Sequence, residues 1–194
     1  LYKAVLGMDE FAAEFPDAHC QGFTQKIQAG VDAGRLDARL LEFDLKRLGA
    51  ELRPERDRLF TYLGAQVLYD RYFLKSLSQE ILETPQYFWM RIAMGLALNE
   101  SKQREDWALK FYDVISSLHY VPSTPTLFHS GTQHPQMSSC YLTTVKDDLS
   151  HILKSIGDNA QLSKWSGGIG NDWTNIRATG SPIKTTNVGS QGVI

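Results

Sequence analysis

The chain has 194 residues, of which 42% are hydrophobic and 22% charged, and its formal net charge is −2. This composition is typical of an ordinary globular protein, and a nearly neutral chain has no long-range attraction to a polyanion, so we expect neither nucleic-acid binding nor a basic membrane-surface role. No apolar stretch approaches the roughly 20 residues that span a bilayer, and residues 1–7 are too short for the core of a signal peptide, which predicts a cytoplasmic protein.

The ends and the cysteines give two further expectations. The sequence begins at Leu1 without an initiator methionine and ends without a tail-like composition, so we expect a fragment of a longer chain. Cys20 and Cys140 form no Cys-x-x-Cys pair, which indicates neither a disulfide scaffold nor a zinc ribbon. The sequence leaves a bridge between these two cysteines open, although a reducing cytosol disfavours it.

Residues 1–120 show the periodicity of a mainly helical domain. Apolar residues at helical spacing predict helices at residues 36–48, 55–74, 85–99 and 101–118, with shorter helical pieces around 23–33. Thr84 followed by Pro85 is a favourable helix start, and Ser101 is expected to open the next helix. The buried stripe of that next helix is predicted to be Trp107, Phe111, Val114, Ile115 and Leu118.

Two groups in this domain could be mistaken for a functional site. Tyr62, Tyr69 and Tyr72 are interpreted as core aromatics whose hydroxyls reach the surface, in preference to a radical or cofactor role. Met90 and Met94 are interpreted as core filler in preference to metal ligands.

Residues 121–194 carry the chemistry-bearing residues. Pro122 and Pro125 disfavour helix and predict an extended turn. Cys140 opens a strand of aromatic and β-branched residues. Asp147 or Asp148 can then cap a helix, and the glycines at 167–170 predict a bend before a possible strand to residue 176. The apolar face of the capped helix is predicted to be Leu149, Ile152, Leu153, Ile156 and Ala160.

Small donors and glycines cluster around Cys140. The hydroxyls are those of Ser123, Thr124, Ser138 and Ser139, and glycines at 167, 168 and 170 let backbone N–H groups approach a ligand. Such a set suits a phosphate, and a thiol fixed on a strand beside it indicates redox or radical chemistry. Taken alone, Cys140 would more often be a small buried hydrophobe.

Two other motif hypotheses fail on spacing. The Gly-Gly-Ile-Gly bend is not a dinucleotide-binding motif, because the third glycine position falls at Trp173 and a predicted helix precedes the bend. His119, His129 and His134 with Cys140 fit no standard zinc spacing. We therefore expect no metal site.

Several motifs in order resemble a known family. They are Ser-Thr-Pro-Thr-Leu-Phe-His-Ser-Gly-Thr at 123–132, Ser-Ser-Cys-Tyr-Leu at 138–142, Lys-Trp-Ser-Gly-Gly-Ile-Gly at 164–170 and Ile-Arg-Ala-Thr-Gly-Ser at 176–181. Together they look like the large (alpha, catalytic) subunit of ribonucleotide reductase, over roughly residues 60–194. The resemblance implies an α/β protein, with a mainly helical domain at 1–120 and the first strands and helix of a ten-stranded α/β barrel at 121–194.

The resemblance also implies roles for individual residues. Cys140 would be the first cysteine of a redox-active pair, acting as proton donor and reductant while a thiyl radical elsewhere removes the ribose 3′-hydrogen. Its partner cysteine and the radical-carrying cysteine are not in this sequence. Substrate contacts would be Thr124, Ser139 and Gly168, which otherwise are a turn hydroxyl, a strand hydroxyl and a bend glycine. Effector contacts would be Asp148, Leu149, Ser150, Lys164, Arg177, Lys184 and Thr185.

The implied partners follow from the family. They are a ribonucleoside diphosphate substrate, deoxynucleoside triphosphate or ATP effectors, a metal-containing beta subunit that supplies the radical, a thioredoxin- or glutaredoxin-type reductant, the remainder of the alpha chain and a second alpha subunit. No cofactor is expected on this chain itself. The runs at 68–74 and 90–100 resemble class I, diphosphate-reducing enzymes more than adenosylcobalamin-dependent ones. A non-catalytic nucleotide-binding or assembly module is the remaining alternative, and binding that does not depend on a cysteine would favour it.

Overall fold

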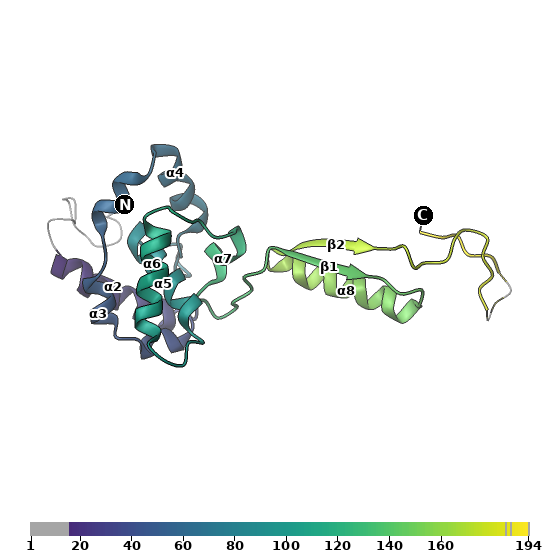
Figure 1. The fold of residues 1–194 in the computed structure, drawn as a ribbon, viewed down its shortest axis with the longest axis horizontal. Coiled ribbons are helices and arrows are strands. Elements are labelled where there is room, and N and C mark those ends of the chain that lie inside the picture. The colour runs from purple at the N-terminus through teal and green to yellow at the C-terminus, as the bar shows by residue number, and fades with distance from the viewer. Residues whose placement is uncertain (1–15, 185, 187, 194) are drawn as a thin grey trace. The chain divides into compact units, whose positions relative to one another are not determined.

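A computed structural model describes residues 16–184, 186 and 188–193, with side chains from Ala18 onward. The chain divides into two compact units between Met137 and Ser138, and each unit is described by itself (Figure 1). The boundary expected from the sequence lay between residues 120 and 121. The segment that separates the two positions contains a short helix that packs on the helical unit, and the exact domain limits stay a prediction.

The first unit is built from helices. In chain order they are α2 (Pro16–Asp32), the 3-10 helix η2 (Ala38–Glu42), α3 (Leu45–Ala50), the 3-10 helix η3 (Pro54–Leu59), α4 (Tyr62–Val67), the π-helix η4 (Leu68–Tyr72), α5 (Pro85–Ala97), α6 (Arg104–Ser116) and α7 (Thr124–His129). Helix α5 forms the centre and lies beside α6 (Figure 1). Met90 and Met94, which belong to α5, are fully buried, and this confirms their interpretation as core residues.

The continuous helix expected at 36–48 is broken. Asp37 caps η2 by accepting a hydrogen bond from the Arg39 N–H at 2.9 Å, and Asp44 caps α3 by accepting from the Arg47 N–H at 3.0 Å. Short polar side chains compete for backbone N–H groups in this way and interrupt helices. The Arg39 guanidinium also hydrogen-bonds Asp37 and holds the pKa of that carboxyl below its usual range.

The helix expected at 55–74 is also divided. Thr61 caps α4, accepting from the Gly64 N–H at 3.2 Å, so the helical run restarts there after η3. Tyr62 is 84% exposed, which makes the prediction of a core role wrong for this residue. Tyr72, by contrast, stacks on Phe128, with the ring centroids 4.7 Å apart.

Helix α6 starts later than expected, and its predicted buried stripe is only partly confirmed. The N-cap residue of α6 is Gln103, at φ +55°, and not Ser101. Ile115 is buried, and Phe111 and Leu118 are partly buried against the core. Trp107 and Val114 of the predicted stripe are exposed. Tyr112 is buried instead, where its hydroxyl accepts a hydrogen bond from the Arg53 N–H at 2.8 Å, and burial raises the pKa of the Tyr112 hydroxyl. The inward face of α6 therefore includes a polar contact with a distant segment, besides the apolar residues Ala108 and Ile115.

The segment after Pro122 is not the extended turn that the prolines suggested. Residues Thr124–His129 form α7, with Pro125 in its first turn. A proline there costs little, because the N–H groups of the first turn have no partner within the helix and the fixed φ of proline suits it. The prediction of an extended turn at these prolines was therefore wrong.

The second unit is a strand–helix–strand arrangement. Strand β1 (Cys140–Thr144) pairs in parallel with β2 (Gly168–Asp172), and α8 (Leu149–Lys164) connects them and runs alongside (Figure 1). The register places Cys140 opposite Gly168 and Thr144 opposite Asp172. The glycines at 168 and 170 thus lie in a strand, not in the predicted bend. That strand ends at residue 172, before the predicted 176. Within the residues described, no helix is long and apolar enough to cross a membrane.

Candidate functional site

The structure brings together three of the residues singled out by the sequence. Ser139 precedes β1, Cys140 opens it, and Gly168 opens β2 directly opposite. The Gly168 N–H donates to the Ser139 carbonyl oxygen at 2.7 Å. Cys140 is exposed, and its thiol is free among the described residues. A strand holds this thiol in a fixed direction, so a ligand lying over the start of β1 and β2 would meet both the sulfur and the backbone.

The face of the strands that carries Cys140 is the open one. Cys140, Leu142 and Thr144 alternate as exposed residues with the half-buried Tyr141 and Thr143. Leu142 is 89% exposed. The connecting helix of a parallel pair covers one face of the sheet, so in the described residues the Cys140 face is left accessible.

Thr124 belongs to the helical unit. It is the first residue of α7, it is exposed, and its Oγ1 lies 3.3 Å from the Tyr72 hydroxyl. The ring of the same tyrosine stacks on Phe128, so Tyr72 contacts α7 at two positions, through its hydroxyl and through its ring. Nothing in the sequence pattern pointed to Tyr72 as a neighbour of Thr124, because the two residues are 52 positions apart.

The start of α8 gathers most of the proposed effector contacts. Asp148 caps the helix by accepting from the His151 N–H at 2.9 Å. Leu149 and Ser150 are exposed in the first turn. The Arg177 Nε donates to Asp147 Oδ2 at 2.8 Å, and Arg177 Nη1 donates to the Pro182 carbonyl oxygen at 3.2 Å. An arginine therefore lies next to a helix N-terminus, and both features favour an anion.

The remaining effector candidates lie apart from that group. Lys164 is the last residue of α8, about 22 Å from its first residue at the usual helical rise, and its Nζ lies over the Trp165 ring at 5.3 Å. Lys184 is exposed in the turn that the Pro182–Gly189 bridge closes. Thr185 lies outside the described residues.

One further carboxylate, that of Asp172, lies at the end of β2. Asp172 accepts hydrogen bonds from the hydroxyl and the backbone N–H of Thr174, which lower the pKa of the Asp172 carboxyl. Asp172 is the last residue of β2, and it lies at the end of the unit where β1 leads into α8. No sequence motif pointed to Asp172 as part of a site.

The predicted apolar face of α8 is largely exposed. Leu149, Leu153 and Ile156 are 70%, 60% and 54% exposed. In the described residues α8 packs on the strands with its other side, where Ser155 is buried. The apolar face is thus available to a further segment or subunit.

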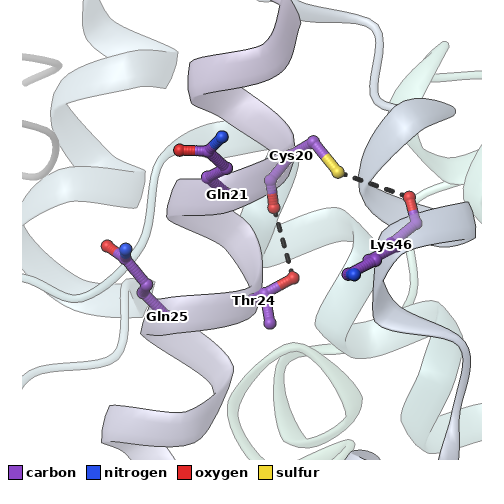
Figure 2. Close-up of a pocket in the computed structure, with 5 residues that line it drawn as sticks. All are labelled: Cys20, Gln21, Thr24, Gln25 and Lys46. Atoms are coloured by element: carbon purple, nitrogen blue, oxygen red, sulfur yellow. Dashed lines mark hydrogen bonds between the residues drawn. The ribbon is translucent and has the colours of Figure 1, made fainter.

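A surface pocket of about 440 Å³ lies in the helical unit. Figure 2 shows its lining, which consists of Cys20, Gln21, Thr24, Gln25 and Lys46. The Cys20 thiol donates to the Lys46 carbonyl oxygen at 3.4 Å, and the Thr24 hydroxyl donates to the Cys20 carbonyl oxygen at 3.3 Å (Figure 2). The sulfur and this hydroxyl are thus engaged with backbone, and none of the lining residues matches a predicted site residue.

Comparison with known proteins identifies the family. The ribonucleotide reductase all-alpha domain matches residues 58–135, and the ribonucleotide reductase barrel domain matches residues 138–194. The first region covers part of the helical unit, and the second coincides with the strand–helix–strand unit. The chain belongs to the ribonucleotide reductase large-subunit family.

Curated relatives match most or all of this chain. Ribonucleoside-diphosphate reductase subunit alpha of Chlamydia pneumoniae is 53% identical over 194 residues, covering 100% of this chain and 18% of the relative. The Chlamydia trachomatis protein of the same name is 54% identical over 195 residues, with the same coverage. The Helicobacter pylori protein is 42% identical over 153 residues, 79% of this chain and 19% of the relative. The chain thus spans about a fifth of the length of these relatives.

Proposed function

We propose that the protein containing this chain is the catalytic subunit of a ribonucleoside-diphosphate reductase, which makes deoxyribonucleotides for DNA synthesis. The observation that carries the proposal is the exposed thiol of Cys140, held on a strand directly opposite Gly168. The alpha-subunit names of relatives 53% and 54% identical over the full chain support it. A class I type, with the radical supplied by a separate beta subunit, fits those names.

The proposed reaction replaces the ribose 2′-hydroxyl by hydrogen. Cys140 gives a proton to the leaving hydroxyl, which departs as water. Cys140 and a second cysteine outside this chain then supply two electrons and become a disulfide. A thioredoxin- or glutaredoxin-type dithiol afterwards reduces that disulfide.

Substrate and effector binding are assigned to different ends of the second unit. Ser139 and Gly168, at the amino ends of the strands, are proposed to contact the ribonucleoside diphosphate substrate. Thr124, in the helical unit, is proposed as a substrate contact in its own right. Asp148, Leu149, Ser150 and Arg177, near the start of α8, are proposed to bind a deoxynucleoside triphosphate or ATP effector. Lys184 and Thr185 extend this set along the chain. Lys164 has less structural support than the residues near the start of α8, because it lies at the other end of that helix.

The proposal includes partners that this chain does not contain. They are the metal-containing beta subunit, the remainder of the alpha chain and a second alpha subunit, in a cytoplasmic enzyme. The exposed apolar side of α8, with Leu149, Leu153 and Ile156, supports contact with one of the alpha-chain surfaces.

Substitution of Cys140 tests the proposal. In the complete protein, Cys140→Ser should abolish multiple turnover with a dithiol reductant, because serine cannot form the disulfide. Affinity for the nucleotide substrate should stay within a few fold, because the hydroxyl has nearly the same size. Cys20→Ser is the matched control and should leave turnover unchanged. Wild-type turnover by the Cys140 variant would contradict the assignment.

A further inference from the structure

A buried ion pair lies in the helical unit, and the proposed function does not use it. Arg91 of α5 and Glu83 are almost completely buried, and Arg91 Nε donates to Glu83 Oε1 at 2.7 Å. Arg91 Nη2 donates to Glu83 Oε2 at 3.3 Å, which makes the contact bidentate. Removing two charges from water is costly, and such pairs are often no more stabilising than apolar side chains. A role in holding neighbouring segments in one arrangement would explain why a charged pair, and not an apolar pair, is buried here.

The rest of the guanidinium holds the end of α7. Arg91 Nη1 donates to the carbonyl oxygens of Ser130 at 2.7 Å and Leu127 at 3.3 Å, and Nη2 donates to Leu127 at 3.4 Å. The last carbonyl groups of a helix have no partner within the helix and carry partial negative charge. Arg91 thus satisfies the C-terminal end of the helix that begins with Thr124.

The turn after α7 is fixed against α5 by further contacts. The Ser130 hydroxyl donates to the Ile92 carbonyl oxygen at 2.8 Å. A Cβ on Gly95 would lie 2.1 Å from the Gly131 nitrogen, so the two backbones are in direct contact. This end of α7 therefore has little freedom to move relative to α5.

Glu83, the acidic partner in this ion pair, also contacts the chain segment that meets the first turn of α7. Its Oε2 accepts from the Leu74 N–H at 2.7 Å, two residues after Tyr72. Tyr72 in turn meets the Thr124 hydroxyl at 3.3 Å and stacks on Phe128. The ion pair thus ties together the segment that carries Tyr72 and the helix that carries Thr124.

We propose that Arg91, held by Glu83, is a positioning residue for substrate binding: it fixes α7 so that the Thr124 hydroxyl stands at the place where it meets the nucleotide. The inference rests on the proposed role of Thr124. Arg91 itself is buried and does not touch the substrate. Its influence passes through the carbonyl groups of Leu127 and Ser130.

The test compares single and double variants of the complete protein with its radical-supplying subunit, using CDP as substrate. Arg91→Lys keeps the charge beside Glu83, but a lysine cannot donate to the carboxylate and both carbonyl groups in the same planar arrangement. We expect the KM for CDP to rise about ten-fold while kcat stays within two-fold. Thr124→Val, which replaces only the hydroxyl by a methyl group, should raise KM by a similar factor.

The double variant separates positioning from a general structural role. If Arg91 acts through Thr124, Arg91→Lys in the Thr124→Val background should change KM by less than two-fold. If Arg91 only stabilises the fold, its effect should be the same in both backgrounds. Tyr72→Phe, which removes the hydroxyl that meets Thr124 but keeps the ring, should raise KM by a few fold.

Each outcome decides the matter. If Thr124→Val leaves KM unchanged, the proposed role of Thr124 is wrong, and the inference about Arg91 is overturned with it. If Thr124→Val raises KM while Arg91→Lys leaves it unchanged or acts additively, only the inference is overturned. Should Arg91→Lys fail to fold, Glu83→Gln replaces it in the same comparison, because it retains the side-chain shape and removes the charge.

Discussion

Cys140 and Gly168 are direct partners in the parallel β1–β2 ladder, and a Cβ built on Gly168 would lie 3.9 Å from the Cys140 sulfur. The same Cβ would lie 3.0 Å from the Ser139 carbonyl oxygen. The strand pair is therefore in close contact beside the thiol, and the absence of a side chain at 168 keeps the backbone accessible there. A glycine at position 168 is therefore needed both for the close approach of the two strands and for the proposed substrate site.

Gly168→Ala should impair substrate binding. The methyl group meets a backbone oxygen that cannot rotate away, so the strands must shift, at a cost of about 1–3 kcal/mol. We expect the apparent affinity for the substrate nucleotide to fall about ten-fold, measured by equilibrium binding to the complete protein. Gly170→Ala is the matched control, because its Cβ would meet only the end of the Leu142 side chain at 3.0 Å, which can rotate. Equal binding by both variants would contradict the prediction.

Arg177→Ala should weaken effector binding. A guanidinium suits paired contacts with phosphate oxygens, and losing such a charge-assisted bond costs about 1.5–3 kcal/mol. The dissociation constant for a deoxynucleoside triphosphate should therefore rise about ten- to a hundred-fold in a direct binding measurement. An unchanged constant would remove Arg177 from the effector site.

Asp147→Asn distinguishes the effector contact from the ion pair. Asp147 and Arg177 are both partly exposed, and pairs of this kind contribute about 0–1 kcal/mol to stability. Removing the competing carboxylate should tighten effector binding, because it frees the guanidinium and removes a negative charge. If Asp147→Asn weakens binding as much as Arg177→Ala, the ion pair itself, and not a phosphate contact, is what the effector requires.

Asp148→Ala should destabilise α8. Its carboxylate satisfies the His151 N–H at the start of the helix, and the loss of such a cap costs about 0.5–2 kcal/mol. The apparent melting temperature should fall accordingly. Asp148→Asn should stay close to the wild type, because asparagine is an equally good cap. A melting temperature lowered equally by both changes would show that charge, and not capping, is the main contribution.

Gly95→Ala and Gly157→Ala should have opposite effects on stability. A Cβ at Gly95 would lie 2.1 Å from the Gly131 nitrogen, whereas one at Gly157 meets nothing within 4 Å. Gly95→Ala should therefore cost about 3 kcal/mol, at the upper end for overpacking. Gly157→Ala, in an exposed turn of α8, should stabilise by about 0.5–1 kcal/mol. Thermal unfolding of the two variants tests the difference, and an unaffected Gly95 variant would contradict the close approach.

The sequence by itself determined the elements that depend on neighbouring residues. Thr84 and Pro85 start α5 and Asp148 caps α8, as their local patterns predicted, because a cap interacts only with the next turn. The strand that begins at Cys140 was also predicted from its β-branched and aromatic residues. The family resemblance gave the helical and barrel parts. The roles of the individual site residues stay predictions.

Only the tertiary structure decided the features that depend on distant partners. The α7 helix forms where two prolines suggested a turn, and the donor that satisfies its last carbonyl groups is Arg91, 36 residues before Leu127. The inward face of α6 includes the contact of Tyr112 with the Arg53 N–H, 59 residues away. Neither partner has a fixed spacing in the sequence, so no periodicity can reveal it. Such contacts contribute strongly to the stability of the fold, because a buried polar group without a partner is costly. The partners come together only in the folded chain.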